Sequence, residues 1–247
     1  MERSFSKRIS FVLLNALLLL AAFAPAHAEV SLPELVQRIQ PAVVTIINYN
    51  SEDKIAGSAT GFFVNRKGHL ITNYHVFKNV YKAEVRTSDG KTYPISSALA
   101  ENRAVDLIKV KVDIPEGAVR WVEISDELPL AAEKIMVLGS PMGLEKTVTE
   151  GIVSALRTIH KKEDIFQISA PISKGSSGSP VINMRGEVIG VATFQIVDGQ
   201  NLNFAVPGKY VVDLSPESRK STKLFRYRKK TLKVKKDKKG SITISNY

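Results

Sequence analysis

The feature that most constrains the fold is a series of short apolar, β-branched runs between residues 43 and 206, each ended by glycine, proline or a polar turn. The runs fall at residues 43–47, 61–64, 69–72, 107–112, 134–138, 147–156, 180–183 and 187–193. Short runs at this spacing are typical of antiparallel barrels and sandwiches. The sequence therefore predicts a mostly β domain.

Helical signals are few. The best lies at residues 32–39, where Ser31 can cap the helix and where Pro33 and Glu34 suit a first turn. A length of 247 residues with 44% hydrophobic residues allows one larger β domain or two small ones.

The chain contains no cysteine. That excludes a disulfide framework, a thiolate nucleophile, iron–sulfur ligation and cysteine zinc sites. We expect no cofactor and no metal.

The N-terminus has the form of a secretory signal peptide. Three basic residues within the first eight precede an apolar run at residues 11–24, and the small residues Ala26 and Ala28 follow. A membrane anchor is the alternative, but the run is shorter than the ~20 residues that a span needs. We expect residues 1–28 to be removed and the mature chain, from Glu29, to work in the periplasm or outside the cell.

The net charge of +11 is unevenly distributed. Residues 215–247 carry twelve basic and two acidic residues, and residues 1–28 add +2, which leaves residues 29–214 at −1. The basic tail has three interpretations: a solvated extension, a β-hairpin formed by residues 231–235 and 241–245, or a segment that attaches to an anionic surface or nucleic acid.

A Gly/Ser-rich turn at residues 174–180 precedes an apolar strand. Gly175 and Gly178 can take positive φ and keep β-carbons away from an approaching substrate backbone. Successive backbone N–H groups can then converge on an oxyanion. Ser177 is the candidate nucleophile, and a purely structural turn is the alternative.

A serine nucleophile needs a base and an acid that orients the base. Of the three histidines after residue 28, His75 follows an apolar strand at a polar break and is the candidate base. We expect His69 to be a solvated strand-end residue and His160 to lie in a loop. Asp106 directly precedes a strand, so its carboxylate can lie beneath the strand's start.

His75, Asp106 and Ser177, in this order and in these contexts, resemble the triad of trypsin-like serine proteases, and the match is closest to the HtrA family of bacterial envelope proteases. The stretches that carry the resemblance are residues 57–64, 71–76, 106–110, 138–144, 149–154, 175–180 and 203–207. The resemblance covers about residues 32–210. It implies an all-β fold of two perpendicular six-stranded antiparallel barrels with the triad in the cleft between them.

The resemblance also implies the roles of the site residues. His75 takes the proton of Ser177, Asp106 orients the imidazole, and the backbone N–H groups of Gly175 and Ser177 form the oxyanion hole. We expect activity to fall at low pH as His75 becomes charged, because a charged imidazole cannot act as the base.

In the family register, eight residues form the substrate-binding cleft. One wall consists of Pro171, Ile172 and Ser173; the edge strand that pairs with substrate consists of Thr193, Phe194 and Gln195; Leu202 and Phe204 close the pocket. No acidic residue stands at the expected base of the pocket, so a basic side chain would be desolvated without a partner. We expect small or medium aliphatic residues before the cleaved bond.

The sequence departs from the family pattern at three positions near the triad. The family has asparagine where Tyr74 and Ser176 stand, and glycine where Ser179 stands. Ser176 also replaces the aspartate that pairs with a new N-terminus in zymogen-type relatives, so we expect loop ordering to control activity instead. The roughly 40 residues after Pro207 are too few for a PDZ domain.

The leading hypothesis is a periplasmic or secreted serine endopeptidase of protein quality control that cleaves unfolded or exposed protein segments. It divides the chain into a signal peptide (1–28), a protease domain (29–214) and a basic tail (215–247). Family members often form trimers through the region that residues 32–41 resemble. The alternative is a protease-fold binding or chaperone protein with impaired catalysis, which the changes at Tyr74 and Ser179 favour.

Overall fold

The computed structural model describes residues 31–140, 147–159, 163–195, 202–214, 233–236 and 242–245, with the backbone alone at residues 159, 194 and 195 and in the last two segments. The expected signal peptide and His160 lie outside the described residues. No described helix has the length and apolar character needed to cross a membrane.

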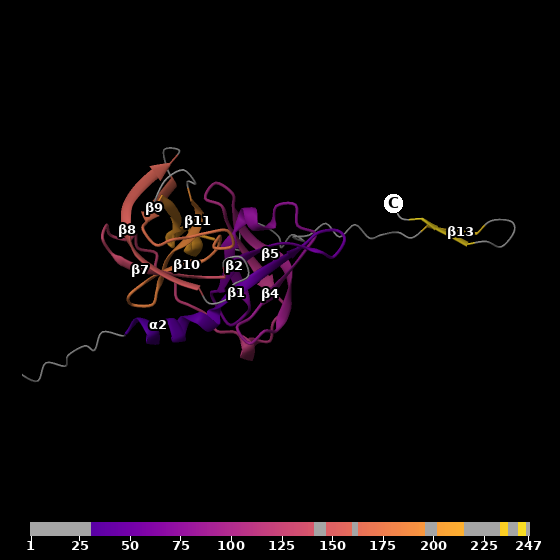
Figure 1. Ribbon diagram of the computed structural model, residues 1–247, viewed down its shortest axis with the longest axis horizontal. Helices are drawn as coiled ribbons and strands as arrows, with labels where there is room; N and C mark the ends of the chain where they lie inside the picture. The colour runs from indigo at the N-terminus through magenta and orange to yellow at the C-terminus, as the bar shows by residue number, and fades with distance from the viewer. Residues whose placement is uncertain are drawn as a thin grey trace, which may run out of the picture. The chain divides into compact units, whose positions relative to one another are not determined.

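Residues 43–112, indigo to magenta in Figure 1, form a closed barrel. Its strand order is β1-β2-β3-β6-β5-β4. Its strands are β1 (Val43–Tyr49), β2 (Ile55–Phe63), β3 (His69–Asn73), β4 (Lys82–Arg86), β5 (Thr92–Asn102) and β6 (Leu107–Val112). All of its pairings are antiparallel.

Residues 134–207 form a second closed antiparallel barrel with the order β10-β11-β12-β9-β8-β7. Its strands are β7 (Lys134–Gly139), β8 (Thr147–Ile159), β9 (Glu163–Ile168), β10 (Pro180–Asn183), β11 (Val188–Gln195) and β12 (Asn203–Pro207). The expected fold class, two six-stranded antiparallel barrels, is confirmed.

The helical elements of the described residues are short. They are α2 (Leu32–Ile39), α3 (Lys209–Val212) and the single turns η1 (Gln40–Ala42), η2 (Tyr74–Phe77) and η3 (Glu116–Ala118). α2 is amphipathic: Leu35 and Ile39 are buried, and they belong to the same core cluster as Ile182 of β10. The helix expected at residues 32–39 is confirmed.

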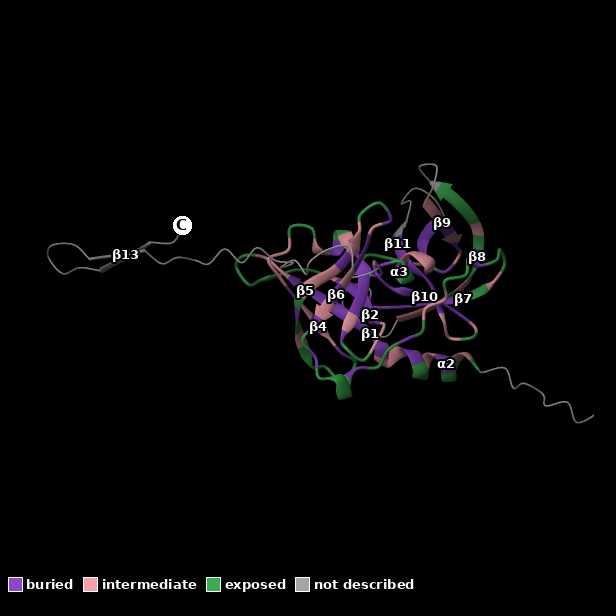
Figure 2. Ribbon diagram, turned by 180° about the vertical axis from the view of Figure 1, so that it is seen from behind, coloured by how far each residue is buried: buried purple, intermediate pink, exposed green. Residues whose placement is uncertain are grey.

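Each barrel has its own core, and a third cluster joins them. Figure 2 shows the buried segments of the strands in purple. In the first barrel, β6 has the burial pattern expected of a barrel strand, with Val110 and Val112 inside and Lys109 and Lys111 partly exposed. The joining cluster includes Phe62 of the first barrel and Met136 of the second. Because both barrels contribute to one apolar interior, their facing surfaces are held in a defined arrangement.

Four strands of the two barrels were missed by the sequence analysis: β4, β5, β9 and β12. Charged residues alternate along β4, and β5 contains Pro94, which pairs with Glu84, and two register shifts against β6. Such strands lack the continuous apolar run that identified the others. They become strands by pairing with neighbouring strands, and only the closed barrel brings those neighbours beside them.

Two strands of the basic tail, β13 (Lys233–Lys236) and β14 (Ile242–Ser245), pair in antiparallel fashion. They overlap the segments expected to form a hairpin.

Candidate active site

The end of β3 and the start of β6 bring His75 and Asp106 together. His75 lies in η2, the turn that follows Asn73. The Asp106 carboxylate accepts a 2.9 Å hydrogen bond from the backbone N–H of His75, and its other oxygen lies 2.6 Å from His75 Nδ1. This pairing leaves Nε2 as the ring nitrogen that does not contact Asp106. The carboxylate thus orients the imidazole as a triad requires.

The backbone of Asp106 is also held by the end of β3. Its φ of +57° lies in the left-handed region, which aspartate tolerates better than most residues. Its carbonyl accepts 3.0 Å hydrogen bonds from the Tyr74 N–H and from Asn73 Nδ2. These bonds stabilise the unusual conformation and with it the direction of the carboxylate.

The second barrel contributes Thr193 of β11 to the same carboxylate. Thr193 Oγ1 donates to Asp106 Oδ2 over 3.0 Å. His75, Asp106 and Thr193 line one cleft together with Ala104, Val105, Glu163, Ile165 and Val206. The sequence analysis had placed Thr193 in the substrate-binding strand, and its contact with Asp106 was missed because no local pattern records a contact across 87 residues.

The serine-containing loop has the backbone geometry that the two glycines permit. Gly175 and Gly178 have φ values of +93° and +83°. A β-carbon on Gly178 would lie 2.1 Å from the Thr60 carbonyl oxygen, so no side chain fits there. Within the described part of the chain, the N–H groups of Gly175 and Ser177 donate no hydrogen bond, as an oxyanion hole requires.

The Ser177 hydroxyl donates a hydrogen bond to the carbonyl oxygen of Thr193 in β11 over 3.5 Å. Among the described residues there is no hydrogen bond between Ser177 and the His75 ring. The structure thus brings His75, Asp106 and Thr193 into direct contact, and Ser177 joins them through Thr193. Contacts between nucleophile and base are often long without substrate.

The residues expected to bind substrate divide between two places. Pro171, Ile172 and Ser173 line a cleft with Val137, Gly139, Thr147, Thr149 and Ser176. Thr193 lines the other cleft, beside His75. The backbones of Phe194 and Gln195 pair with Phe204 and Asn203 of β12. Leu202 is half-buried and Phe204 is buried.

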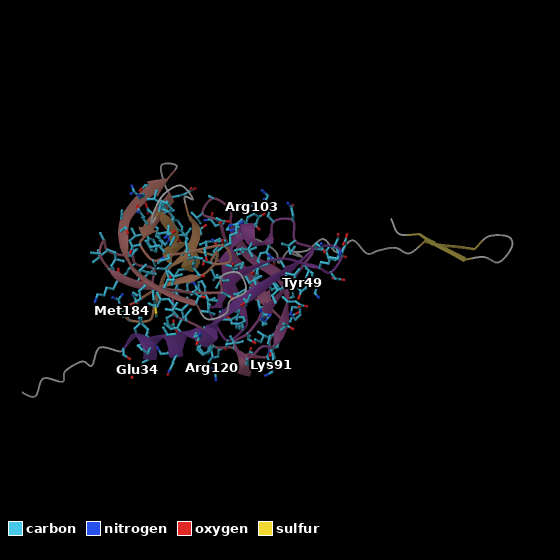
Figure 3. All side chains as sticks on the ribbon, viewed as in Figure 1. Glu34, Tyr49, Lys91, Arg103, Arg120 and Met184 are labelled. Carbon is cyan, nitrogen blue, oxygen red and sulfur yellow. The ribbon has the colours of Figure 1, made fainter. Side chains whose placement is uncertain are left out.

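Two of the three departures from the family pattern, Tyr74 and Ser179, have distinct environments. The guanidinium of Arg103 lies over the ring of Tyr74, 4.8 Å from the ring centre (Arg103 is labelled in Figure 3). Ser179 is fully buried and does not have a positive φ, so its backbone does not need glycine. Its hydroxyl has no hydrogen-bond partner among the residues that the structure describes.

His69 differs from the solvated residue that we expected. It begins β3 but is half-buried, and its Nδ1 lies 3.0 Å from Asn65 Nδ2. Burial lowers the pKa of His69, and the positive charges of Lys111, Lys109 and Lys67 lower it further. The strand pairing of β3 with β6, which sequence alone did not provide, places Lys109 and Lys111 beside it.

The chain has two barrels, an aspartate that contacts both a histidine and a threonine, and a serine loop flanked by two glycines. Together these features define the class of two-barrel serine peptidases. Residues 59–191 match the family described as the trypsin-like peptidase domain, which is more than half of the chain. The chain belongs to the trypsin-like peptidase family.

Within that family the chain is similar to HtrA-type proteins. It is 32% identical to serine protease HTRA1 of Xenopus laevis over 86% of this chain and 49% of the relative. It is 34% identical to the probable periplasmic serine endoprotease DegP-like of Buchnera aphidicola, over 69% of this chain and 37% of the relative. The chain therefore spans about half the length of these relatives or less.

A solved structure has the same fold. The serine endoprotease from Yersinia pestis superposes with a TM-score of 0.66 and 27% identity, over 74% of this chain and 64% of that one.

Proposed function

We propose that the protein is a serine endopeptidase that hydrolyses exposed or unfolded protein segments through His75, Asp106 and Ser177. The observation that carries the proposal is the Asp106 carboxylate, which binds His75 Nδ1 at 2.6 Å and the Thr193 hydroxyl at 3.0 Å. A carboxylate held in this way fixes the imidazole tautomer and stabilises the imidazolium that forms when the base takes a proton.

The chemistry follows from the groups around this pair. Ser177 Oγ attacks the peptide carbonyl as His75 removes its proton, and the N–H groups of Gly175 and Ser177 stabilise the oxyanion. His75 then protonates the leaving amine, and water repeats the sequence on the acyl-enzyme. No cofactor enters these steps.

A fluorophosphonate probe tests the proposal because it reacts only with an activated serine. We expect the purified chain to be labelled and Ser177→Ala to be unlabelled, with peptide turnover lowered by about 10⁶-fold. Ser176→Ala, a neighbouring serine in the same loop, is the matched control and should still be labelled. A loss of less than tenfold in Ser177→Ala would exclude this residue as the nucleophile.

One observation favours a second function, a protease-fold binding or chaperone protein. The Ser177 hydroxyl is directed to the Thr193 carbonyl rather than to His75. If the folded chain stays unlabelled both with and without an unfolded protein present, and yet suppresses aggregation of that protein, the second function is supported.

The substrate preference that we propose is for small or medium aliphatic residues before the cleaved bond. Pro171, Ile172 and Ser173 supply no charge, and the cleft that they line contains no acidic residue. A basic side chain there would be desolvated without a partner. A peptide library cleaved mainly after arginine or lysine would contradict this preference.

We further propose that the protein works in the periplasm or is secreted, after removal of residues 1–28. The name of the Buchnera relative and the form of the N-terminus support this. Assembly into trimers and attachment of the basic tail to an anionic surface belong to the same proposal. Edman sequencing of the exported chain should begin at Glu29; an intact N-terminus would contradict cleavage.

A further inference from the structure

The loop that carries Ser177 is held by a residue of the other barrel to which the triad assigns no role. Thr60 of β2 is fully buried. Its hydroxyl donates to the carbonyl of Gly175 over 2.8 Å, and its backbone N–H donates to the carbonyl of Ser177 over 2.9 Å. A single residue therefore contacts the loop on both sides of Ser176.

The peptide between Gly175 and Ser176 is bound at both ends. Its carbonyl is held by Thr60, and its N–H donates to the carbonyl of Ser173 over 2.9 Å. Gly175 has a φ of +93°, and a glycine allows such a peptide to rotate with little steric resistance. These two hydrogen bonds, rather than side-chain sterics, therefore determine the orientation of the peptide. The two oxyanion-hole N–H groups lie directly before and directly after it.

The direction of the Thr60 hydroxyl is itself determined. It accepts a 3.0 Å hydrogen bond from the N–H of Ser140, so its single proton is available for the Gly175 carbonyl. Ser140 in turn accepts a 2.7 Å hydrogen bond at its Oγ from Thr45. Thr45, Thr60 and Ser140 are all buried, so water does not readily replace a lost partner.

We infer that Thr60 is a positioning residue for the oxyanion hole. Its hydroxyl holds the Gly175 carbonyl in the orientation that leaves the N–H groups of Gly175 and Ser177 directed at the reacting carbonyl. The inference rests on the proposed peptidase function. Among the described residues Thr60 makes no hydrogen bond with the His75 ring or with Asp106, so it acts on the stability of the oxyanion and not on the proton transfer.

Thr60→Val tests the inference because it keeps the shape and β-branching of the side chain and removes the hydroxyl. We expect kcat and the rate of fluorophosphonate labelling to fall by about 10²-fold, the size expected for the loss of an oxyanion-hole donor, with KM changed by less than about threefold. The pH at which labelling is half-maximal should stay unchanged. Thr60→Ser restores the hydroxyl and should label within about threefold of the original chain.

Thr45→Val is the matched control. It removes another buried hydroxyl from the same junction, but that hydroxyl bonds Ser140 Oγ and not the loop. It should lower the melting temperature about as much as Thr60→Val and leave labelling within about threefold. The inference is overturned if Thr60→Val labels like the original chain, or if Thr45→Val loses as much labelling.

A second readout separates this inference from the peptidase function. In the ¹⁵N-labelled protein, the amide resonances of Gly175, Ser176 and Ser177 should shift in Thr60→Val and stay in place in Thr45→Val. Unchanged loop resonances in Thr60→Val overturn the positioning role even if the chain proves inactive. Shifted resonances in a chain that is never labelled support the positioning role and contradict the peptidase function.

Discussion

At the scale of single residues, the junction between the barrels is held by buried hydroxyl groups. Thr193 contacts Asp106 and Thr60 contacts Gly175 across the junction, and within the first barrel Thr72 Oγ1 donates to the Thr60 carbonyl over 2.7 Å. Each of these hydroxyls has a partner, as buried polar groups require. Ser179 is the exception in this region, since its fully buried Oγ has no partner in the described structure.

Ser179→Ala should therefore stabilise the protein. The change removes an unsatisfied buried hydroxyl, and an unmade hydrogen bond of this kind costs about 1–3 kcal/mol. We expect the free energy of unfolding to rise by about 1 kcal/mol and the melting temperature by about 2–4 °C for a domain of this size. Differential scanning calorimetry measures both quantities.

Thr72→Val is the control for that change. Its hydroxyl is equally buried but is bonded, so its removal should lower the melting temperature. A drop in both variants would show that the Ser179 hydroxyl has a partner in solution, contrary to the expectation.

At the scale of elements, α3 is attached to the start of β9 by polar contacts. Lys209 Nζ donates to the Asp164 carboxylate, and Tyr210 Oη accepts from the Asp164 N–H over 2.9 Å. Thr158 of β8 donates to the other carboxylate oxygen over 3.0 Å. Asp164 thus ties two strands and a helix at one end of the second barrel.

The pH dependence of stability should report this attachment. The hydrogen bond from Lys209 lowers the pKa of Asp164 below its ordinary 3.8, against the opposing effect of burial, and the bond from Thr158 lowers it further. The unfolded chain therefore binds the proton first as pH falls. The contribution of Asp164 is fully present above about pH 4 and is lost as pH falls through its lowered pKa in the folded state.

Asp164→Asn should then lower the free energy of unfolding by about 0.5–1 kcal/mol at pH 7 and by less at pH 3. Urea unfolding at the two pH values measures the difference. Glu52→Gln, which removes an exposed ion pair with Lys54, is the control and should change nothing at either pH. If Asp164→Asn lowers the free energy of unfolding as much at pH 3 as at pH 7, the carboxylate charge is not the cause of the lost stability.

At the scale of the whole molecule, the described core ends with α3 and the residues that follow it. Val211 and Leu214 belong to the cluster that joins the two barrels, and Lys109 Nζ of the first barrel donates to the Leu214 carbonyl. The segment from α3 to Leu214 therefore connects the two barrels and is not a loose extension.

Two truncations test where the folding unit ends. Removal of residues 216–247 should leave the melting temperature within about 2 °C of the full chain, because Leu214 keeps its core contacts. Removal of residues 209–247 should lower it by more than about 5 °C, because it deletes two buried aliphatic side chains and the Lys209–Asp164 ion pair. Thermal unfolding followed by circular dichroism distinguishes the two, and equal melting temperatures would contradict the role of α3.

The sequence by itself determined the elements whose signal is local. The strands at residues 107–112 and 180–183 and the helix at residues 32–39 were predicted with the bounds that the structure has, because apolar periodicity and flanking turn residues record them directly. His75, Asp106 and Ser177 were recognised from the short contexts around them.

Only the tertiary structure decided the contacts between distant segments. It paired the strands β4 and β5 into a barrel, and it half-buried His69 beside Lys109 and Lys111 of β6. It also brought Thr193 to Asp106 across 87 residues and Thr60 to Gly175 across 115. The residues that flank a serine or threonine in the sequence are the same whether its hydroxyl faces water or a buried carbonyl. Its hydrogen-bond partner is therefore determined only when the two barrels close and pack against each other.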